Sequence, residues 1–461
     1  MSIAEKLVSL AEKISSALTH CNQALSSKGV NEANSLWEIG TRIYEIEVGG
    51  GEVGSGEDNF TLLLQKNIEK VNSNNITTIG SYIFAGCNSL TSINLPACTS
   101  IGGYAFSGCT SLTSVNLPAC TTVDNNAFYF CNSLTSINLP ACTSIGGYAF
   151  SGCTSLTSVN LPACTTVGGS AFISCSSLTS VNLPVCKTVE TSGFAWCKSL
   201  TSIDLPECTT VEAVAFYYCL SLTSLNLPVC TSIGTSGFAW CKSLTSIDLP
   251  ACKTIGASAF NVCTLLETIN LPVCTTIMMS GFALCGSLTS VNLPVCTTLS
   301  SYAFSNCTAL TSVNLPACTT VGYAAFGSCT SLTSIDLPVC TSIASAAFSN
   351  CTALTSVNLP ACTSIFSSAF ISCKSLTLID LPACTSIGSN AFAYCSALMS
   401  VILRNSKVAT LNNSKAFQNT PIQYSSYTGA FGSIFVPASL VASYQAATNW
   451  KYYSSRITAI T

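Results

Sequence analysis

The 461-residue chain has little charge. Only 8% of its residues are Asp, Glu, Lys or Arg, and its net charge is −3. An average protein carries about 25% charged residues, so Ser, Thr and Asn must supply most of the polar surface here. Nucleic-acid binding requires a dense Lys/Arg surface. We therefore expect no nucleic-acid partner.

Histidine is almost absent, since His20 is the single example in the chain. Acid–base catalysis most often uses histidine, and neither a Ser-His-Asp nor a Cys-His set can be assembled inside a repeat array that contains no histidine. The chain also contains no C-x-x-C pair, the spacing typical of structural zinc sites. We therefore predict no catalytic residue, no metal site and no cofactor, and we expect that the protein is not an enzyme.

Long apolar runs are missing as well. No run approaches the ~18 residues that span a bilayer, so we predict no transmembrane segment. The first residues, "MSIAEKLVSLAEKISSALTH", place Glu and Lys among the apolar positions. A secretory signal has a basic start, an unbroken apolar run and a small-residue cleavage site. This pattern is not visible, so we do not expect export by the ordinary route.

Cysteine, by contrast, is abundant and periodic. Fifteen of the 30 cysteines lie 22 residues apart between Cys87 and Cys395, and fourteen more share that period between Cys98 and Cys384, each in "LPxC". The stretch "AFSGCTSLTSVNLPACTTV" occurs at 105–123 and again at 149–167. A fixed period in the twenties is typical of a solenoid.

The physical pattern of one repeat supports a coil. In "TSVNL" the alternation points Val115 and Leu117 inward, and Pro118 ends the strand because it has no N–H to donate. Val123 then returns to the core, and Phe128 fills the far side through a short helical or irregular segment. One repeat cannot bury its inner face alone, whereas stacked repeats can.

The repeat Leu112-x-x-Val115-x-Leu117-x-x-Cys120-x-x-Val123 resembles a leucine-rich repeat with Cys in its Asn/Cys position. The added "IG…AFxxC" segment resembles the BspA-like repeats of bacterial and protist surface proteins. This resemblance implies a right-handed leucine-rich-repeat solenoid with one parallel β-sheet and short helical or irregular convex segments. It also implies adhesion or recognition at a cell surface, with an extracellular or cell-surface protein or glycan as the partner.

Buried thiols are the simplest interpretation of the cysteines, because small apolar side chains with a weak S–H donor suit a repeated core position. Disulfides between neighbouring coils would need closer Cβ atoms than parallel side chains give. We assign structural roles to two columns. One column is expected to bond the turn backbone: Cys98, Cys120 and Cys142. The other is expected to pack against the phenylalanines: Cys109, Cys131 and Cys153.

The domain boundaries follow from where the period begins and ends. We predict a helical attachment or oligomerisation segment at 1–48, a Gly-rich linker at 49–58, a helix and N-terminal cap at 59–78, about 15 coils at 79–403, and a C-terminal cap at 404–461. Self-association through residues 1–47 is one expectation, and a helical hairpin packed on itself is the alternative. The N-terminus also faintly resembles leaders of prophage tail-associated proteins, and this resemblance implies that the protein is associated with a virion.

Variation is concentrated just before the "AFxxC" cysteine. Trp196, Tyr218 and Trp240 occupy that position on three successive coils, and Tyr217, Lys198 and Lys242 lie beside them in sequence. If exposed, they form a partner-binding stripe of the kind found at interface hot spots. The alternative is half-buried padding.

Acidic residues interrupt one outward column of the strands. Asp204 and Asp248 replace Asn there, as do Asp336 and Asp380. We include Asp204 and Asp248 among the candidate partner-binding residues, with solvated surface acids as the alternative.

These observations predict a non-catalytic binding or adhesion protein that recognises host or neighbouring-cell macromolecules. A structural spacer and a phage tail-associated receptor-binding protein are the alternatives. The resemblance implies a cell-surface or extracellular location, and the missing signal pattern leaves a virion or the cytoplasm as alternatives.

Overall fold

The computed structural model describes residues 68–423 and 432–460. The predicted attachment segment at 1–48, the linker at 49–58 and His20 lie outside the described residues. The chain divides into two compact units, Met1–Cys164 and Thr165–Thr461, and each is considered in turn. Both are built from 22-residue coils, each of which contributes two short strands to parallel ladders.

In the first unit, each coil has a three-residue strand followed by a two-residue strand. The three-residue strands are β1 (Lys70–Asn72), β3 (Ser92–Asn94), β5 (Ser114–Asn116), β7 (Ser136–Asn138) and β9 (Ser158–Asn160). The two-residue strands are β2 (Thr78–Ile79), β4 (Ser100–Ile101), β6 (Thr122–Val123) and β8 (Ser144–Ile145). Pairing is parallel with a shift of one repeat, so Ile93 pairs with Val115 and Ile101 with Val123.

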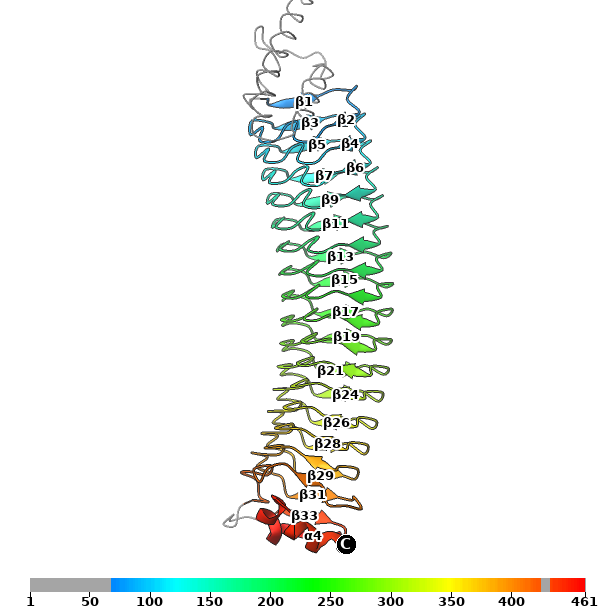
Figure 1. Cartoon of the computed structure of the whole chain (residues 1–461). Helices are drawn as coiled ribbons and strands as arrows, with labels where there is room; N and C mark the ends of the chain where they lie inside the picture. Colours follow the sequence, from blue (N-terminus) through cyan, green and yellow to red (C-terminus); the bar gives the residue numbers. More distant parts are fainter. Residues whose placement is uncertain (1–67, 424–431, 461) are drawn as a thin grey trace, which may run out of the picture. The chain divides into compact units, whose positions relative to one another are not determined.

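The second unit repeats this arrangement (Figure 1). We call its longer strands the strand row: β11 (Ser180–Asn182), β13 (Ser202–Asp204), β15 (Ser224–Asn226), β17 (Ser246–Asp248), β19 (Thr268–Asn270), β21 (Ser290–Asn292), β23 (Ser312–Asn314), β25 (Ser334–Asp336), β27 (Ser356–Asn358), β29 (Leu378–Leu381) and β31 (Ser400–Leu403). We call its shorter strands the short row: β10 (Thr166–Val167), β12 (Thr188–Val189), β14 (Thr210–Val211), β16 (Ser232–Ile233), β18 (Thr254–Ile255), β20 (Thr276–Ile277), β22 (Thr298–Leu299), β24 (Thr320–Val321), β26 (Ser342–Ile343), β28 (Ser364–Ile365), β30 (Ser386–Ile387) and β32 (Thr410–Leu411).

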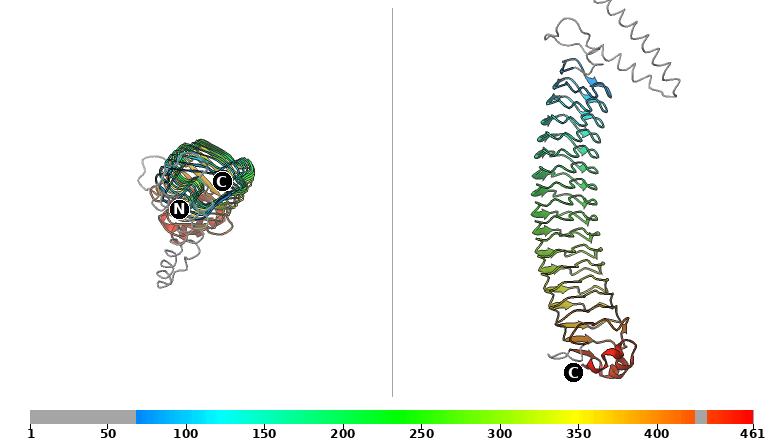
Figure 2. Two further views of the ribbon diagram at one scale, coloured as in Figure 1. Left: turned by 90° about the horizontal axis from the view of Figure 1, so that it is seen from above. Right: turned by 90° about the vertical axis from the view of Figure 1, so that its left-hand side faces the viewer.

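The fold is the predicted parallel solenoid, with one addition. The sequence predicted a single sheet, but pairs of residues after the prolines, such as Thr188–Val189 and Thr210–Val211, also pair from coil to coil and form the short row. The remaining side of each coil consists of hydrogen-bonded turns. The side view of the second unit shows helical ribbon only near its red C-terminal end (Figure 2).

Of the helix and N-terminal cap predicted at 59–78, the structure describes residues 68–78, which contain two strands and no helix. Residues 70–72 form β1 and residues 78–79 form β2. Lys70 and Asn72 are exposed and Val71 is buried, the alternation of a half-buried strand. Because Val71 pairs with Ile93, the repeat ladder begins one coil earlier than the cysteine period indicates.

The interior of both units consists of columns of identical side chains. The repeated Leu, Phe and Cys positions of the described coils are almost completely buried. The phenylalanine rings of neighbouring coils stack nearly parallel, for example Phe84 on Phe106 at 5.2 Å and Phe216 on Phe238 at 5.0 Å between ring centroids. Each coil therefore covers the apolar surface of the coil before it, as the solenoid model requires.

Residues beyond β31 cover the last coil of the second unit. They form β32, β33 (Ser433–Val436), η1 (Ala438–Leu440), α4 (Val441–Ala446), η2 (Trp450–Arg456) and β34 (Ile457–Ala459). Tyr453 meets Phe417 edge to face at 5.4 Å, and the indole N–H of Trp450 donates to the carbonyl of Ala409 at 2.7 Å. The Asn449 amide donates to the Leu411 carbonyl. These side chains cover the final phenylalanine and bond carbonyls at the end of the short row.

Candidate binding surface

The two cysteine columns are part of the core. Cys120 and its equivalents donate to a carbonyl two residues later, here that of Thr122 at 3.2 Å. Cys131 and its equivalents donate to the carbonyl of the phenylalanine of the preceding coil, here Phe106 at 3.2 Å. Burial raises the pKa of Cys219 to about 12. Thiols in this state are not nucleophiles at neutral pH.

Within residues 68–423 and 432–460, no group of three or more His, Cys, Asp or Glu side chains is placed to hold a metal ion. Among the helices of the same residues, none is long and apolar enough to cross a bilayer.

The position just before the "AFxxC" cysteine has a left-handed backbone in every described coil. We call this position the outer column. Many coils place a residue there that tolerates this conformation: Gly86, Gly108, Gly152, Ser174, Asn306, Ser328, Asn350 and Ser372. The left-handed conformation lets the backbone N–H of each such residue donate a hydrogen bond to a carbonyl of the next coil. The N–H of Trp196, for example, donates to the carbonyl of Tyr217 at 2.8 Å.

Five successive coils break this preference. Trp196, Tyr218, Trp240, Val262 and Leu284 occupy the outer column with φ between 61° and 66°. A bulky residue in this region costs about 1 to 2 kcal/mol relative to a right-handed or extended conformation. The fold does not require these residues, since Ser and Asn serve the same turn elsewhere. Strained side chains that folding does not explain are typical of functional surfaces.

The rings of the first three coils form one cluster. The centroid of Trp196 lies 4.2 Å from that of Tyr218, with the two planes tilted by 34°. The centroid of Trp240 lies 5.9 Å from Tyr218 on the other side, with a 37° tilt. Tyr217 meets Trp196 edge to face at 5.7 Å. Trp196 is 37% exposed, and Tyr217, Tyr218 and Trp240 are half-buried.

Two lysines complete this group. The Lys198 ammonium lies 5.7 Å from the Trp196 ring centroid and 6.0 Å from that of Tyr218, and Lys242 lies 4.9 Å from that of Trp240. Both lysines are exposed, and such cation–π contacts hold the charge beside the rings. We call Trp196, Tyr217, Tyr218, Trp240, Lys198 and Lys242 the aromatic cluster.

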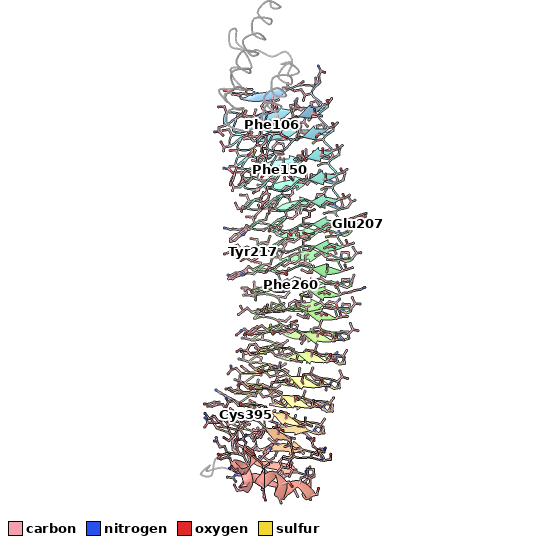
Figure 3. All side chains as sticks on the ribbon, viewed as in Figure 1. Phe106, Phe150, Glu207, Tyr217, Phe260 and Cys395 are labelled. Carbon is pink, nitrogen blue, oxygen red and sulfur yellow. The ribbon has the colours of Figure 1, made fainter. Side chains whose placement is uncertain are left out.

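Tyr217 fits because its neighbours are small. The equivalent position is Ala195 in the coil before and Ala239 in the coil after, and both alanines are buried. A large ring between two methyl groups can lie against the coil and still reach solvent. Its side chain projects from the side of the coil opposite Glu207 (Figure 3).

The candidate acids lie elsewhere, in the strand row. Asp204 Oδ1 accepts a hydrogen bond from the Asn226 amide at 2.8 Å, and Asp248 Oδ1 accepts one from Asn270 at 2.8 Å. Asp380 instead pairs with Arg404 at 2.8 Å. The structure therefore does not bring Asp204 and Asp248 into the aromatic cluster.

These amide contacts join the strand row into coil pairs. Strands β13–β15, β17–β19 and β21–β23 form separate two-stranded ladders. The middle residue of the first strand in each pair is buried and that of the second is half-buried, as Ile203 and Leu225 show. The outward side chain of the first strand accepts a hydrogen bond, and the Asn amide of the second strand donates it. Because a carboxylate can only accept, Asp fits the first strand of a pair and not the second.

A further aromatic group was missed from the sequence. Tyr82 and Tyr104 stack at 4.8 Å with their planes 5° apart, and both have left-handed φ. They lie two residues before the buried phenylalanine of their coils. The residue type at that position varies, with tyrosine in only some coils, which is the signal that would have identified them.

The family follows from the sequence of these coils. The model described as "BspA type Leucine rich repeat region (6 copies)" matches residues 61–175, 121–235, 231–340 and 319–435. The chain belongs to this family. BspA-type membership supports a binding or scaffold role in general, and leucine-rich-repeat solenoids are typically non-catalytic.

The chain is also similar to solved structures. A leucine-rich repeat protein from Bacteroides ovatus is 28% identical, with 73% of this chain and 87% of that chain covered and a TM-score of 0.58. A leucine rich cell surface protein from Faecalibacterium prausnitzii is 24% identical, with 72% and 84% covered and a TM-score of 0.35. A search of curated proteins gave no match.

Proposed function

We propose that this BspA-type solenoid is a non-catalytic recognition protein whose aromatic cluster binds a macromolecule at a cell surface. One observation carries this proposal: three large aromatic residues adopt a strained left-handed conformation on successive coils and remain accessible. Trp and Tyr are the residues most enriched at binding hot spots. The fold accommodates Ser or Asn at the same turn, so a contact outside the fold is the simplest reason to keep the aromatic rings.

Because these residues are strained, the experiment can remove their rings without an expected loss of stability. Changing Trp196, Tyr218 and Trp240 to Asn in one variant removes the rings and places a residue suited to left-handed φ at each position. We expect this variant to be at least as stable as the intact chain. Against an array of extracellular-matrix proteins and glycans, we expect it to bind at least tenfold more weakly.

Tyr394 provides the matched control. It is also exposed, has φ 63° and occupies the outer column of a coil outside the aromatic cluster. Tyr394→Asn should change stability in the same direction and leave array binding unchanged. Equal binding by the intact chain and the triple variant would contradict the proposal, and no binding by either would favour a spacer.

The predicted surface location is supported by the family, whose members are typically surface-associated. The phage tail alternative depends on residues 1–48, which lie outside the described residues, and stays a prediction. Incubating intact cells of the source organism with a protease would test surface exposure, since only an exposed chain is degraded.

A further inference from the structure

We propose, resting on the function above, that the aromatic cluster binds an extended protein segment that carries apolar side chains and carboxylates. The cluster is one end of a longer surface. The next two outer-column residues are Val262 and Leu284, and Leu284 is 45% exposed. Two further apolar side chains that lie nearby in sequence are also exposed: Leu265, three residues after Val262, and Met279, five residues before Leu284.

Ring geometry argues against a sugar as the partner. Sugars stack on an open aromatic face, but Tyr218 has Trp196 at 4.2 Å and Trp240 at 5.9 Å. The Lys198 and Lys242 ammonium groups lie over the indoles. Tyr218 thus has a ring on either side and each indole has an ammonium group over it, an arrangement that suits the side chains of a protein better than a stacked sugar.

The aliphatic continuation points the same way. Val262 and Leu284 offer a sugar neither a ring face nor a hydrogen bond, whereas both can bury apolar side chains of a peptide. With a coil spacing of ~4.8 Å, the five outer-column residues span roughly 19 Å. A chain at about 3.3 Å per residue would cover that length with about six residues.

The positive charges of Lys198 and Lys242 indicate that the bound segment carries acidic side chains. Lys198 and Lys242 form no salt bridge with another described residue. Four acids of these coils are occupied or lie on another side. Asp204 and Asp248 accept from asparagines, Glu212 accepts from the backbone N–H and hydroxyl of Thr191, and Glu207 lies opposite Tyr217 (Figure 3). Two unpaired cations among apolar groups complement carboxylates.

The first test is a selection from phage-displayed random decapeptides on the intact chain, after depletion on the Trp196, Tyr218 and Trp240 to Asn variant. We expect the enriched peptides to contain Asp and Glu at twice the library frequency or more, together with Leu, Ile, Val or Phe. Enriched peptides without excess carboxylates would overturn the inference.

The most enriched peptide is then synthesised and titrated. We expect Lys198→Gln with Lys242→Gln to weaken binding about three- to tenfold and to reduce its salt dependence. Val262→Asn with Leu284→Asn should weaken it about tenfold, while Tyr394→Asn should not alter it. Unchanged affinity in both double variants would also overturn the inference.

A parallel titration uses alginate and heparin fragments, which carry carboxylates or sulfates without apolar side chains. If these bind through the cluster and no peptide does, the protein partner is wrong but the proposed function stands. If neither probe distinguishes the intact chain from the triple variant, both proposals fail.

Discussion

Two groups of coils have the same turn and different residues in it. In the first unit Gly86, Gly108 and Gly152 hold the outer column with φ of 70° to 74°, and Phe130 holds it in one coil with φ 55°. In the second unit Trp196, Tyr218 and Trp240 hold it with φ of 62° to 65°. The buried Phe, Leu and Cys columns are common to both groups. The backbone is therefore set by the columns and ladders, and the outer residue can vary without changing the fold.

The largest effect should come from the thiols that both groups share. Burial raises the pKa of Cys153 in the first unit and of Cys219 in the second to about 12. A group whose folded pKa is raised contributes stability below its unfolded pKa, near 8.5, and loses it as the pH rises toward the folded pKa. The difference between these two pKa values opposes ionisation of one folded thiol by on the order of 5 kcal/mol, so a few such thiols outweigh a typical folding free energy.

We therefore expect the chain to unfold between pH 9 and 12 under reducing conditions, as followed by circular dichroism. At pH 8 the folded chain should leave almost all its thiols unreacted with a thiol reagent, and denaturant should expose them. An unchanged spectrum at pH 12 would show that the thiols do not limit stability in either group.

An intermediate loss of stability is expected when the hydrogen-bond donor of a coil pair is changed to an acceptor. Asn226→Asp would place two carboxylates where Asn226 now donates to Asp204 at 2.8 Å. We expect a loss of about 1 to 2 kcal/mol in urea unfolding, from the lost hydrogen bond and the repulsion, and a smaller loss in high salt.

The matched change is Asp204→Asn, which keeps an acceptor opposite the Asn226 amide. It should alter stability by less than about 0.5 kcal/mol. If the two substitutions had the same effect, the distinction between accepting and donating members of a pair would be wrong.

The smallest loss of stability is expected when a glycine in the outer column of the first unit is replaced by a tryptophan like those of the second unit. A Cβ at Gly108 would meet only ordinary contacts, the nearest being the Cα of Gly86 at 3.7 Å. We expect Gly108→Trp to fold with a loss of about 1 kcal/mol, because only the left-handed conformation opposes it. Equilibrium urea unfolding would measure this loss.

Gly152 shows why the site of exchange matters. A Cβ there would lie 2.6 Å from the Phe130 ring, so Gly152→Trp should be more harmful than Gly108→Trp. Equal losses at the two positions would indicate that φ alone, and not the neighbouring coil, sets the tolerance.

Sequence reasoning recovered what the period encodes. The 22-residue spacing predicts the coils, and the alternation in "TSVNL" predicts which of Ser114, Val115 and Leu117 face the core. It did not predict the short row, because two residues such as Thr122–Val123 are too few for an alternation signal. It also misjudged Lys70–Asn72, since a helical pattern before a repeat cannot show that a ladder has already begun.

The candidate site was located but not understood from sequence. Trp196, Tyr218 and Trp240 were identified by their variation, and their neighbours Tyr217, Lys198 and Lys242 do contact the same rings. The left-handed φ that strains these bulky residues depends on hydrogen bonds to the next coil, which no local pattern reveals. Asp204 and Asp248 were included as candidates because they replace Asn in an outward strand column, and their side chains lie in the strand row, apart from the aromatic cluster.

The coil pair also determines how such a chain can lengthen or shorten. Residues 191–206 and 235–250 are identical and lie 44 positions apart, which is one pair. Genetic exchange between these two copies would remove or add a whole pair, leaving every accepting Asp beside a donating Asn at the new junction. The number of coils can therefore change during evolution in steps of one pair, and each new junction keeps the same hydrogen-bonded side-chain contacts.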